Sequence, residues 1–293
     1  MLTWTDAGAV ERPRVVQIRL QRSYPGRVRA GAPVPTRSMP TAEVLANLRW
    51  FAEAGTRGRA CDAVVLSGVG AASRPDLGVL CAEARARGMQ RVTLHAGVED
   101  LDAIQPEGLP VDQIVLPLQP GEAGATLAAG ARVILACRAA GIPVVANTVL
   151  APSALPLLRA AARAAIAAEV AGFTLTFPFP VDGGQAGAVV PGPRAVAALR
   201  EVVPGLVDAG VKVAIKGLPI CYLGELGGLV RRSANRWYVD ADHQLGKALL
   251  FFPDVVAFHK AEVCRFCTAD ARCDGFFATY LRRPGFPPLT PIG

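Results

Sequence analysis

Short apolar segments alternate with longer amphipathic segments along most of the chain, from about residue 14 to residue 217. The short segments are rich in β-branched residues, a pattern that predicts strands. They cover 15–20, 62–68, 91–97, 112–118, 143–149, 173–179 and 211–217. The longer segments are rich in alanine and arginine with helical spacing, and glycines stand at their carboxyl ends. We expect helices over 41–55, 75–88, 126–141, 154–172 and 193–210.

This alternation predicts the fold class. Near-continuous apolar strands separated by helices are typical of parallel strands that are buried on both faces. Right-handed crossovers curl such a series into a barrel or a doubly wound sheet. The chain has six or seven such units and no glycine-rich dinucleotide fingerprint, which favours an α/β barrel, complete or partial.

The pattern also predicts three segments. Residues 1–13 are an N-terminal extension, and residues 14–217 are the β/α barrel. Residues 218–293 show no clear βα unit, so we expect an irregular C-terminal tail that folds against the barrel. At 293 residues and 52% hydrophobic composition, the chain has ample material for a buried core.

Charge and targeting signals exclude several classes of function. The net charge of +7 comes from scattered arginines that are not interleaved with aromatic residues, so no nucleic-acid partner is predicted. The longest uncharged run, 139–158, contains glycine and three prolines, which predict a strand followed by a loop. No membrane span is therefore predicted. The start of the chain lacks a secretory signal pattern. We therefore expect a cytoplasmic protein.

Three cysteines near the end of the chain form the motif C-x2-C-x5-C, which comprises Cys264, Cys267 and Cys273. A four-coordinate metal site needs one more ligand, and Cys221 in "GLPICYLG" follows the last expected strand. Four thiolates suit either zinc or an iron–sulfur cluster. Structural zinc sites usually show two C-x2-C pairs, and this chain has one, which favours iron and sulfur. A zinc-stabilised module and three unconnected thiols are the alternatives.

Cys61, Cys81 and Cys137 stand alone within or beside expected strands and helices. We interpret them as small buried apolar residues.

Polar residues at the carboxyl ends of the expected strands are candidates for cofactor binding, because barrel proteins place ligands there. They are Ser67, Gly68, His95, Asn147 and Thr148. A lone histidine in such a position is more often a structural residue than a ligand or base. The two polar residues inside "VVANTVL" are stronger candidates, because a strand interior tolerates polarity poorly unless something uses it. No catalytic residue is assigned.

Three stretches resemble the radical S-adenosylmethionine (SAM) superfamily. Residues 64–97 are similar to the segment that carries the Gly-Gly-Glu-Pro turn of that family, and "FTLTFPFP" at 173–180 resembles a late barrel strand. Residues 260–292, with Cys221 upstream, resemble the segment by which a subgroup of the family binds an auxiliary 4Fe-4S cluster. The resemblance implies a partial (β/α)6 TIM-like barrel of the radical SAM type with an iron–sulfur tail.

The chain departs from the family at two places. The C-x3-C-x2-C loop that binds the SAM-cleaving cluster should follow the first strand, and the corresponding stretch 21–35 contains no cysteine. In "SGVGAA" at 67–72, Gly70 stands where the family has glutamate. These departures predict a protein that keeps one auxiliary 4Fe-4S cluster and has lost the cluster that cleaves SAM.

The function that follows is a non-catalytic partner, scaffold or electron-transfer subunit, working with a true radical enzyme or a peptide substrate. One alternative is an enzyme that binds SAM or another small molecule at the barrel mouth and does different chemistry. The other is the zinc-stabilised binding module.

Overall fold

A computed structural model describes residues 3–4, 10–11, 13–22, 37–53, 60–118, 125–178, 189–232, 236–251 and 258–293. The chain divides into two compact units. Unit 1 consists of Met1–Leu116, Ala136–Val144 and Asn235–Phe252. Unit 2 consists of Pro117–Leu135, Val145–Ala234 and Pro253–Gly293.

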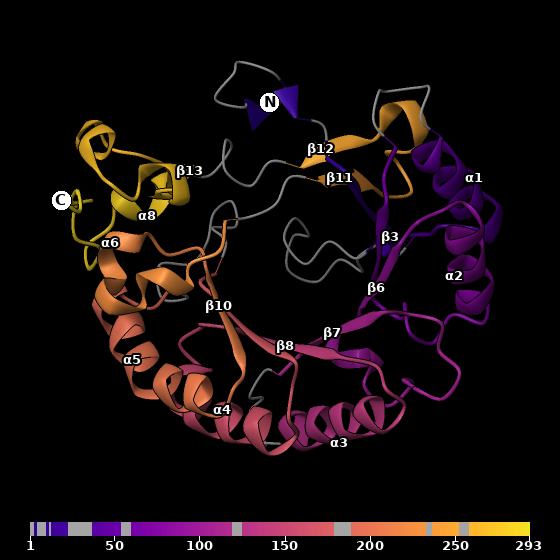
Figure 1. Ribbon diagram of the computed structural model, residues 1–293, viewed down its shortest axis with the longest axis horizontal. Coiled ribbons are helices and arrows are strands. Elements are labelled where there is room, and N and C mark those ends of the chain that lie inside the picture. The colour runs from indigo at the N-terminus through magenta and orange to yellow at the C-terminus, as the bar shows by residue number, and fades with distance from the viewer. Residues whose placement is uncertain are drawn as a thin grey trace, which may run out of the picture. The chain divides into compact units, whose positions relative to one another are not determined.

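Unit 1 is built on a mainly parallel sheet with the strand order β7-β6-β5-β3-β11-β12. The bounds are β3 Val15–Arg22, β5 Ala63–Gly68, β6 Arg91–His95, β7 Gln113–Pro117, β11 Arg236–Val239 and β12 Leu249–Phe251. β12 runs antiparallel to β11, and the short β4 (Arg37–Ser38) runs antiparallel to β3. Helices α1 (Thr41–Ala52) and α2 (Leu77–Ala86) pack against each other (Figure 1). β1 (Thr3–Trp4) and β2 (Val10–Glu11) form a separate antiparallel pair.

Unit 2 contains the parallel strands β8 (Val144–Val149), β9 (Gly172–Thr176) and β10 (Lys212–Lys216), in the order β10-β9-β8. Its helices α4 (Leu158–Ala167) and α5 (Gly192–Asp208) pack against each other (Figure 1). The tail begins with α6 (Ile220–Leu223) and the 3-10 turn η3 (Gly224–Leu229). It ends with β13 (Phe258–His259), η5 (Glu262–Phe266), η6 (Asp270–Arg272), β14 (Phe276–Phe277) and α8 (Ala278–Leu281).

Alternating burial along the strands explains why these segments form a sheet. In β3, Val16, Ile18 and Leu20 are fully buried, whereas Gln17 and Arg19 between them are half-buried. Successive side chains of a strand point to opposite faces, so one face of β3 is apolar and the other is polar. The polar face is the one on which functional side chains can meet a ligand.

The structure confirms a strand in each of the seven predicted segments and a helix in each of the five, with α3 spanning Ala125–Ala139; positions 54, 55 and 179 of these predictions lie outside the described residues. Gly88, Gly141 and Gly210 follow their helices with φ of +83°, +75° and +78°, as the glycine pattern predicts. The helix predicted over 154–172 ends earlier. Glu169 takes the left-handed position with φ of +51°, and Gly172 is already the first residue of β9.

The structure differs from the predicted irregular tail at residues 236–239, which form β11 and pair in parallel with β3. β11 is only four residues long and begins with arginine, so its sequence shows no strand pattern that distinguishes it from the flanking segments. As a result, Asn235–Phe252 belongs to unit 1 although it lies within the segment 218–293.

No described helix is both long enough and apolar enough to span a membrane.

Candidate metal centre and strand-end residues

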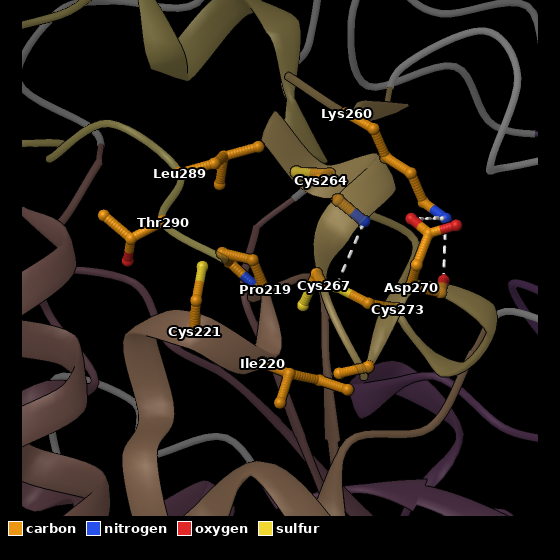
Figure 2. Close-up of a pocket in the computed structure, with 12 residues that line it drawn as sticks. Pro219, Ile220, Cys221, Lys260, Cys264, Cys267, Asp270, Cys273, Leu289 and Thr290 are labelled. Atoms are coloured by element: carbon orange, nitrogen blue, oxygen red, sulfur yellow. Dashed lines mark hydrogen bonds and ion pairs between the residues drawn. The ribbon is translucent and has the colours of Figure 1, made fainter. Parts of the chain in front are cut away.

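Four cysteines from two distant parts of the chain line one pocket in unit 2 (Figure 2). They are Cys221, Cys264, Cys267 and Cys273. Cys221 lies on α6, whereas the other three lie on or directly beside the turns η5 and η6. The spacing C-x2-C-x5-C and the single upstream cysteine therefore meet at the same pocket.

Backbone N–H groups point at three of these sulfur atoms. Gly275 donates to Sγ of Cys273 over 3.4 Å, and Ile292 donates to Sγ of Cys267 over 3.3 Å. Burial raises the pKa of Cys221, the backbone of Thr290 lowers it through a hydrogen bond, and the nearby thiols Cys273 and Cys264 raise it. Hydrogen bonds to the ligand sulfur atoms change the affinity and the reduction potential of metal groups that are bound by thiolates.

Gly275 has a conformation that other residues rarely adopt, with φ of +86°. A Cβ atom at this position would lie 2.3 Å from the carbonyl oxygen of His259. The close approach joins the loop after Cys273 to β13, and it directs the N–H of Gly275 toward the pocket.

Within unit 2, an aromatic cluster packs the last part of the tail against the end of β9. Phe177, which follows β9, contacts Phe276, Tyr280 and Phe286, and each ring lies within 6.0 Å of the Phe177 centroid. Phe276, Phe277 and Tyr280 are at most 2% exposed. The hydroxyl of Tyr280 donates to the carbonyl of Pro178 over 3.1 Å. These rings therefore form an apolar core that joins the tail to the end of β9.

The donor set of the pocket fits a thiophilic group. Besides the four thiols, its lining contains the Lys260–Asp270 ion pair, in which Nζ lies 2.8 Å from Oδ1, and mostly apolar residues. Thiolates suit zinc and iron–sulfur clusters alike. As the side chains stand, no three described His, Cys, Asp or Glu residues form a group that could hold a single metal ion.

The remaining cysteines are buried, with exposures of 4% for Cys61 and 0% for Cys81 and Cys137. Burial raises the pKa of Cys61 to about 12 and those of Cys81 and Cys137 to about 11. All seven cysteines are free thiols. These three are therefore the small buried residues that the sequence predicts, with little thiolate at neutral pH.

The predicted strand-end residues of unit 1 lie on adjacent strands. Ser67 pairs with His95 on β6 and with Arg19 on β3, which gives a polar row across three strands. Ser67 is 5% exposed and accepts a hydrogen bond from Nε2 of Gln17 over 3.0 Å, whereas His95 is exposed. Gly68 has φ of +121°, and a Cβ there would lie 2.7 Å from the Gln21 carbonyl oxygen. Their role in ligand binding stays a prediction.

The predicted residues of unit 2 are adjacent on β8 and point to opposite faces of that strand. Thr148 is fully buried and donates to the carbonyl of Leu118 over 2.6 Å. Asn147 is half-buried and accepts a hydrogen bond from the hydroxyl of Thr176 over 2.9 Å. The binding role of both residues stays a prediction, and only Asn147 lies on the less buried face.

Sequence reasoning missed several polar residues that share these faces. Gln17 and Arg19 alternate with apolar residues in β3, and Arg19 donates to the Tyr238 hydroxyl over 3.4 Å. Thr174 and Thr176 alternate in the same way in β9, and Thr174 is the register partner of Asn147. The period-two spacing of polar residues inside predicted strands is the signal that could have found them.

The loop after β5, which resembles the Gly-Gly-Glu-Pro segment, is fixed by a bidentate ion pair. Arg74 contacts both carboxylate oxygens of Asp76 over 2.8 and 2.6 Å, and the Thr41 hydroxyl donates to the same carboxylate over 2.6 Å. Arg74 also donates to the carbonyl of Met39 over 2.9 Å. These contacts lower the pKa of Asp76 to about 2, with the hydrogen bond from Arg74 as the largest cause.

Comparison with known proteins identifies the fold. No protein-family model matches the chain, and no curated protein matches it in sequence. Among solved structures it is similar to anSMEcpe with bound AdoMet, with a TM-score of 0.58, 9% identity, and coverage of 90% of this chain and 89% of that protein. It is also similar to SuiB of Streptococcus suis, with a TM-score of 0.55, 10% identity, and coverage of 80% and 60%.

A SuiB structure bound to S-adenosylmethionine gives a TM-score of 0.50 at 11% identity and covers 71% of this chain. The chain spans 48–60% of the length of SuiB in these comparisons. SuiB and anSMEcpe are radical SAM enzymes. At such low identity the likeness shows the fold alone: a mostly parallel α/β fold that matches the partial TIM-like barrel of radical SAM enzymes, as predicted.

Proposed function

We propose that this protein is an iron–sulfur protein with a radical SAM fold that binds one 4Fe-4S cluster through its tail and has lost the cluster that cleaves SAM. Its role would be that of a non-catalytic partner, scaffold or electron-transfer subunit. The observation that carries the proposal is the meeting of Cys221, Cys264, Cys267 and Cys273 at one pocket (Figure 2).

A four-cysteine cluster supplies one-electron transfer when bound. The chain's own residues would hold it and set its surroundings. The four thiols would be the ligands, and the N–H groups of Gly275 and Ile292 would stabilise two of them as thiolates. The apolar lining, with Leu289 at 6% exposure, would limit the access of water.

The loss of the SAM-cleaving cluster rests on the sequence. Residues 21–35, which begin with the last two residues of β3, contain no cysteine, and Gly70 stands at the position expected for glutamate. Beyond Arg22, that stretch lies outside the described residues. Cleavage of SAM in the family needs a cluster iron with an open coordination position, and four cysteine ligands in the tail would leave none.

A true radical enzyme or a peptide is the partner that we propose. A structure of SuiB bound to the precursor peptide SuiA has a TM-score of 0.51 to this chain. This similarity in fold supports a peptide as the partner. Seven free thiols suit a reducing compartment, so we assign the protein to the cytoplasm.

A second candidate function is an enzyme that binds SAM or another small molecule at the strand ends. Its support is the polar row of Arg19, Ser67 and His95 in unit 1, together with the SAM bound to structural neighbours. Neither observation supplies a reacting group, so the iron–sulfur role is the stronger conclusion.

The decisive experiment measures iron and acid-labile sulfide after anaerobic purification. Wild type and the control Cys137→Ala should each hold about four irons and about four sulfides per chain. Cys267→Ala should lose most of both. Zinc without sulfide would point to the zinc-stabilised module, and a wild-type chain without either metal would overturn the proposal.

A further inference from the structure

The last residues of the chain cross the cysteine pocket. Leu289 and Thr290 line it beside the four thiols (Figure 2). The backbone of Thr290 hydrogen-bonds to Cys221, and the N–H of Ile292 donates to Sγ of Cys267 over 3.3 Å. One short segment therefore contacts a cysteine of α6 and a cysteine of the C-x2-C pair.

This segment is anchored at both of its ends. Thr268 donates from its N–H to the carbonyl of Ile292 over 3.0 Å and from its hydroxyl to the same oxygen over 3.2 Å. At the other end, the hydroxyl of Tyr222 donates to the carbonyl of Pro287. Three of the residues from 287 to 291 are prolines, which restrict the backbone before it folds and reduce the entropy lost on ordering.

The contacts are of a kind that stabilises thiolate. A hydrogen bond to an ionised acceptor is about twice as strong as one between neutral groups. Because Thr290 and Ile292 donate from the backbone, their side chains can change while the donors stay in place. A proline at position 292 removes the donor, since proline has no N–H.

We infer that residues 289–292 are an integral part of the metal centre: a strap whose backbone N–H groups position Cys221 and Cys267 and whose Leu289 covers the pocket. Thr290 and Ile292 are positioning residues, and they lie outside the cysteine motif. The inference rests on the proposed function, because it assigns the strap to the metal group that the four cysteines would hold.

The test compares Ile292→Pro with Ile292→Ala in the full chain. The first measurement is the rate at which an iron chelator removes iron from the anaerobic protein. The proline variant should lose iron about tenfold faster than the alanine variant, as expected for one lost hydrogen bond to a charged group. Thr268→Val, which loosens the strap and keeps the N–H of Ile292, should lie between them.

The second measurement needs no metal. Alkylation of Cys267 by iodoacetamide at neutral pH in the metal-free protein, followed by mass spectrometry, should be slower in Ile292→Pro than in Ile292→Ala, because the thiolate is the form that reacts and the proline variant lacks the donor that stabilises it. Alkylation of Cys273, which is held by Gly275, should be the same in both variants.

The outcomes separate the two claims. Equal rates for Cys267 in the two variants would overturn the strap, whether or not the protein binds iron. If the wild-type protein binds no iron but Cys267 is still alkylated more slowly in Ile292→Pro than in Ile292→Ala, the strap contact is supported and the proposed function is wrong. A proline variant in which Cys61 is alkylated as fast as Cys267 has unfolded. Thr268→Val then decides, because its Cys267 must be alkylated more slowly than that of wild type if the strap holds the donor in place.

Discussion

Arg232 donates a hydrogen bond from Nε to Oδ1 of Asp274 over 2.6 Å, and it reaches the carbonyl of Ala271 from Nη1 over 3.3 Å. Asp274 follows Cys273 directly, and its side chain is only 10% exposed. The ion pair therefore fixes the loop that carries the last cysteine to the chain just after η3.

Replacement of Arg232 by Gln should loosen this loop. A largely buried carboxylate without its cationic partner costs about 1–3 kcal/mol. We expect faster hydrogen exchange over 264–275 and faster metal loss, measured by mass spectrometry and by chelator competition.

The matched control is Arg265→Gln, which breaks an ion pair with Glu262 whose side chains are 64% and 81% exposed. Exposed pairs contribute less than about 1 kcal/mol, so exchange in the loop should stay at the wild-type rate. If both variants behave alike, the Arg232–Asp274 pair has no special part in holding the loop.

Gly275→Ala should disrupt the tail more than any other single-methyl addition there. The new Cβ would meet the His259 carbonyl at 2.3 Å, and the φ of +86° is unfavourable for alanine. We expect a clear loss of stability and, with the N–H of Gly275 displaced from Cys273, a lower iron content. Thermal unfolding and iron analysis measure the two effects.

Gly205→Ala in α5 is the control, because nothing lies within 4 Å of its added methyl group. Alanine in a helix interior stabilises by about 0.5–1 kcal/mol relative to glycine. A Gly275→Ala protein with the stability and iron content of wild type would show that the close approach to His259 is not required.

The sequence predicted the strands well because their apolar runs are long and are bounded by glycine or proline. β11 was missed because its neighbour in the sheet is β3, more than 200 positions away, and a partner at that distance leaves no local pattern. The end of the helix predicted over 154–172 was also misplaced, because Gly172 is the first residue of β9 and not the glycine that follows the helix. α4 ends at Ala167, and Glu169 just beyond it adopts the left-handed backbone conformation that glycine usually takes there, which the side-chain type alone did not reveal.

The four cysteines that line the pocket could be singled out from the sequence, because cysteine is a rare residue and the spacing C-x2-C-x5-C is visible in the sequence itself. The strap was not, because the groups that Thr290 and Ile292 present to sulfur are backbone N–H groups, which every residue except proline carries. At the strand ends, residue type alone was also insufficient. Asn147 and Thr148 are both polar, but successive side chains of a strand point to opposite faces, so only Asn147 lies on the less buried face.

Asp76 should make stability depend on pH in the acid range. Its pKa is lowered to about 2, chiefly by the hydrogen bond from Arg74, whereas an unfolded aspartate titrates near about 4. The stabilisation is therefore fully present above about pH 4 and is lost as the pH falls toward 2. Asp76→Asn should be less stable than wild type at pH 7, and the difference should shrink below pH 4.

Urea unfolding at several pH values measures this difference. Glu225→Gln serves as a control, because Glu225 is 73% exposed and its Nε–Oε1 distance to Arg200 is 3.4 Å. That variant should match wild type at pH 7. A gap between wild type and Asp76→Asn that stays constant from pH 7 to pH 2 would contradict the assignment of the stabilisation to the ionised carboxylate.

The last prediction separates a partner protein from a radical enzyme. Incubated anaerobically with SAM and a strong reductant, the iron-loaded protein should form no 5′-deoxyadenosine. Residues 21–35 contain no cysteine to hold a second cluster, and the four cysteines of the tail would fill every ligand position of the first. Calorimetry with SAM should be run beside it, because binding without cleavage would favour the second candidate function and direct attention to Ser67 and Asn147.

Cys267→Ala is the control for any product that does form. Catalytic 5′-deoxyadenosine that disappears in this variant would mean that the tail cluster itself cleaves SAM, and the non-catalytic role would then be wrong.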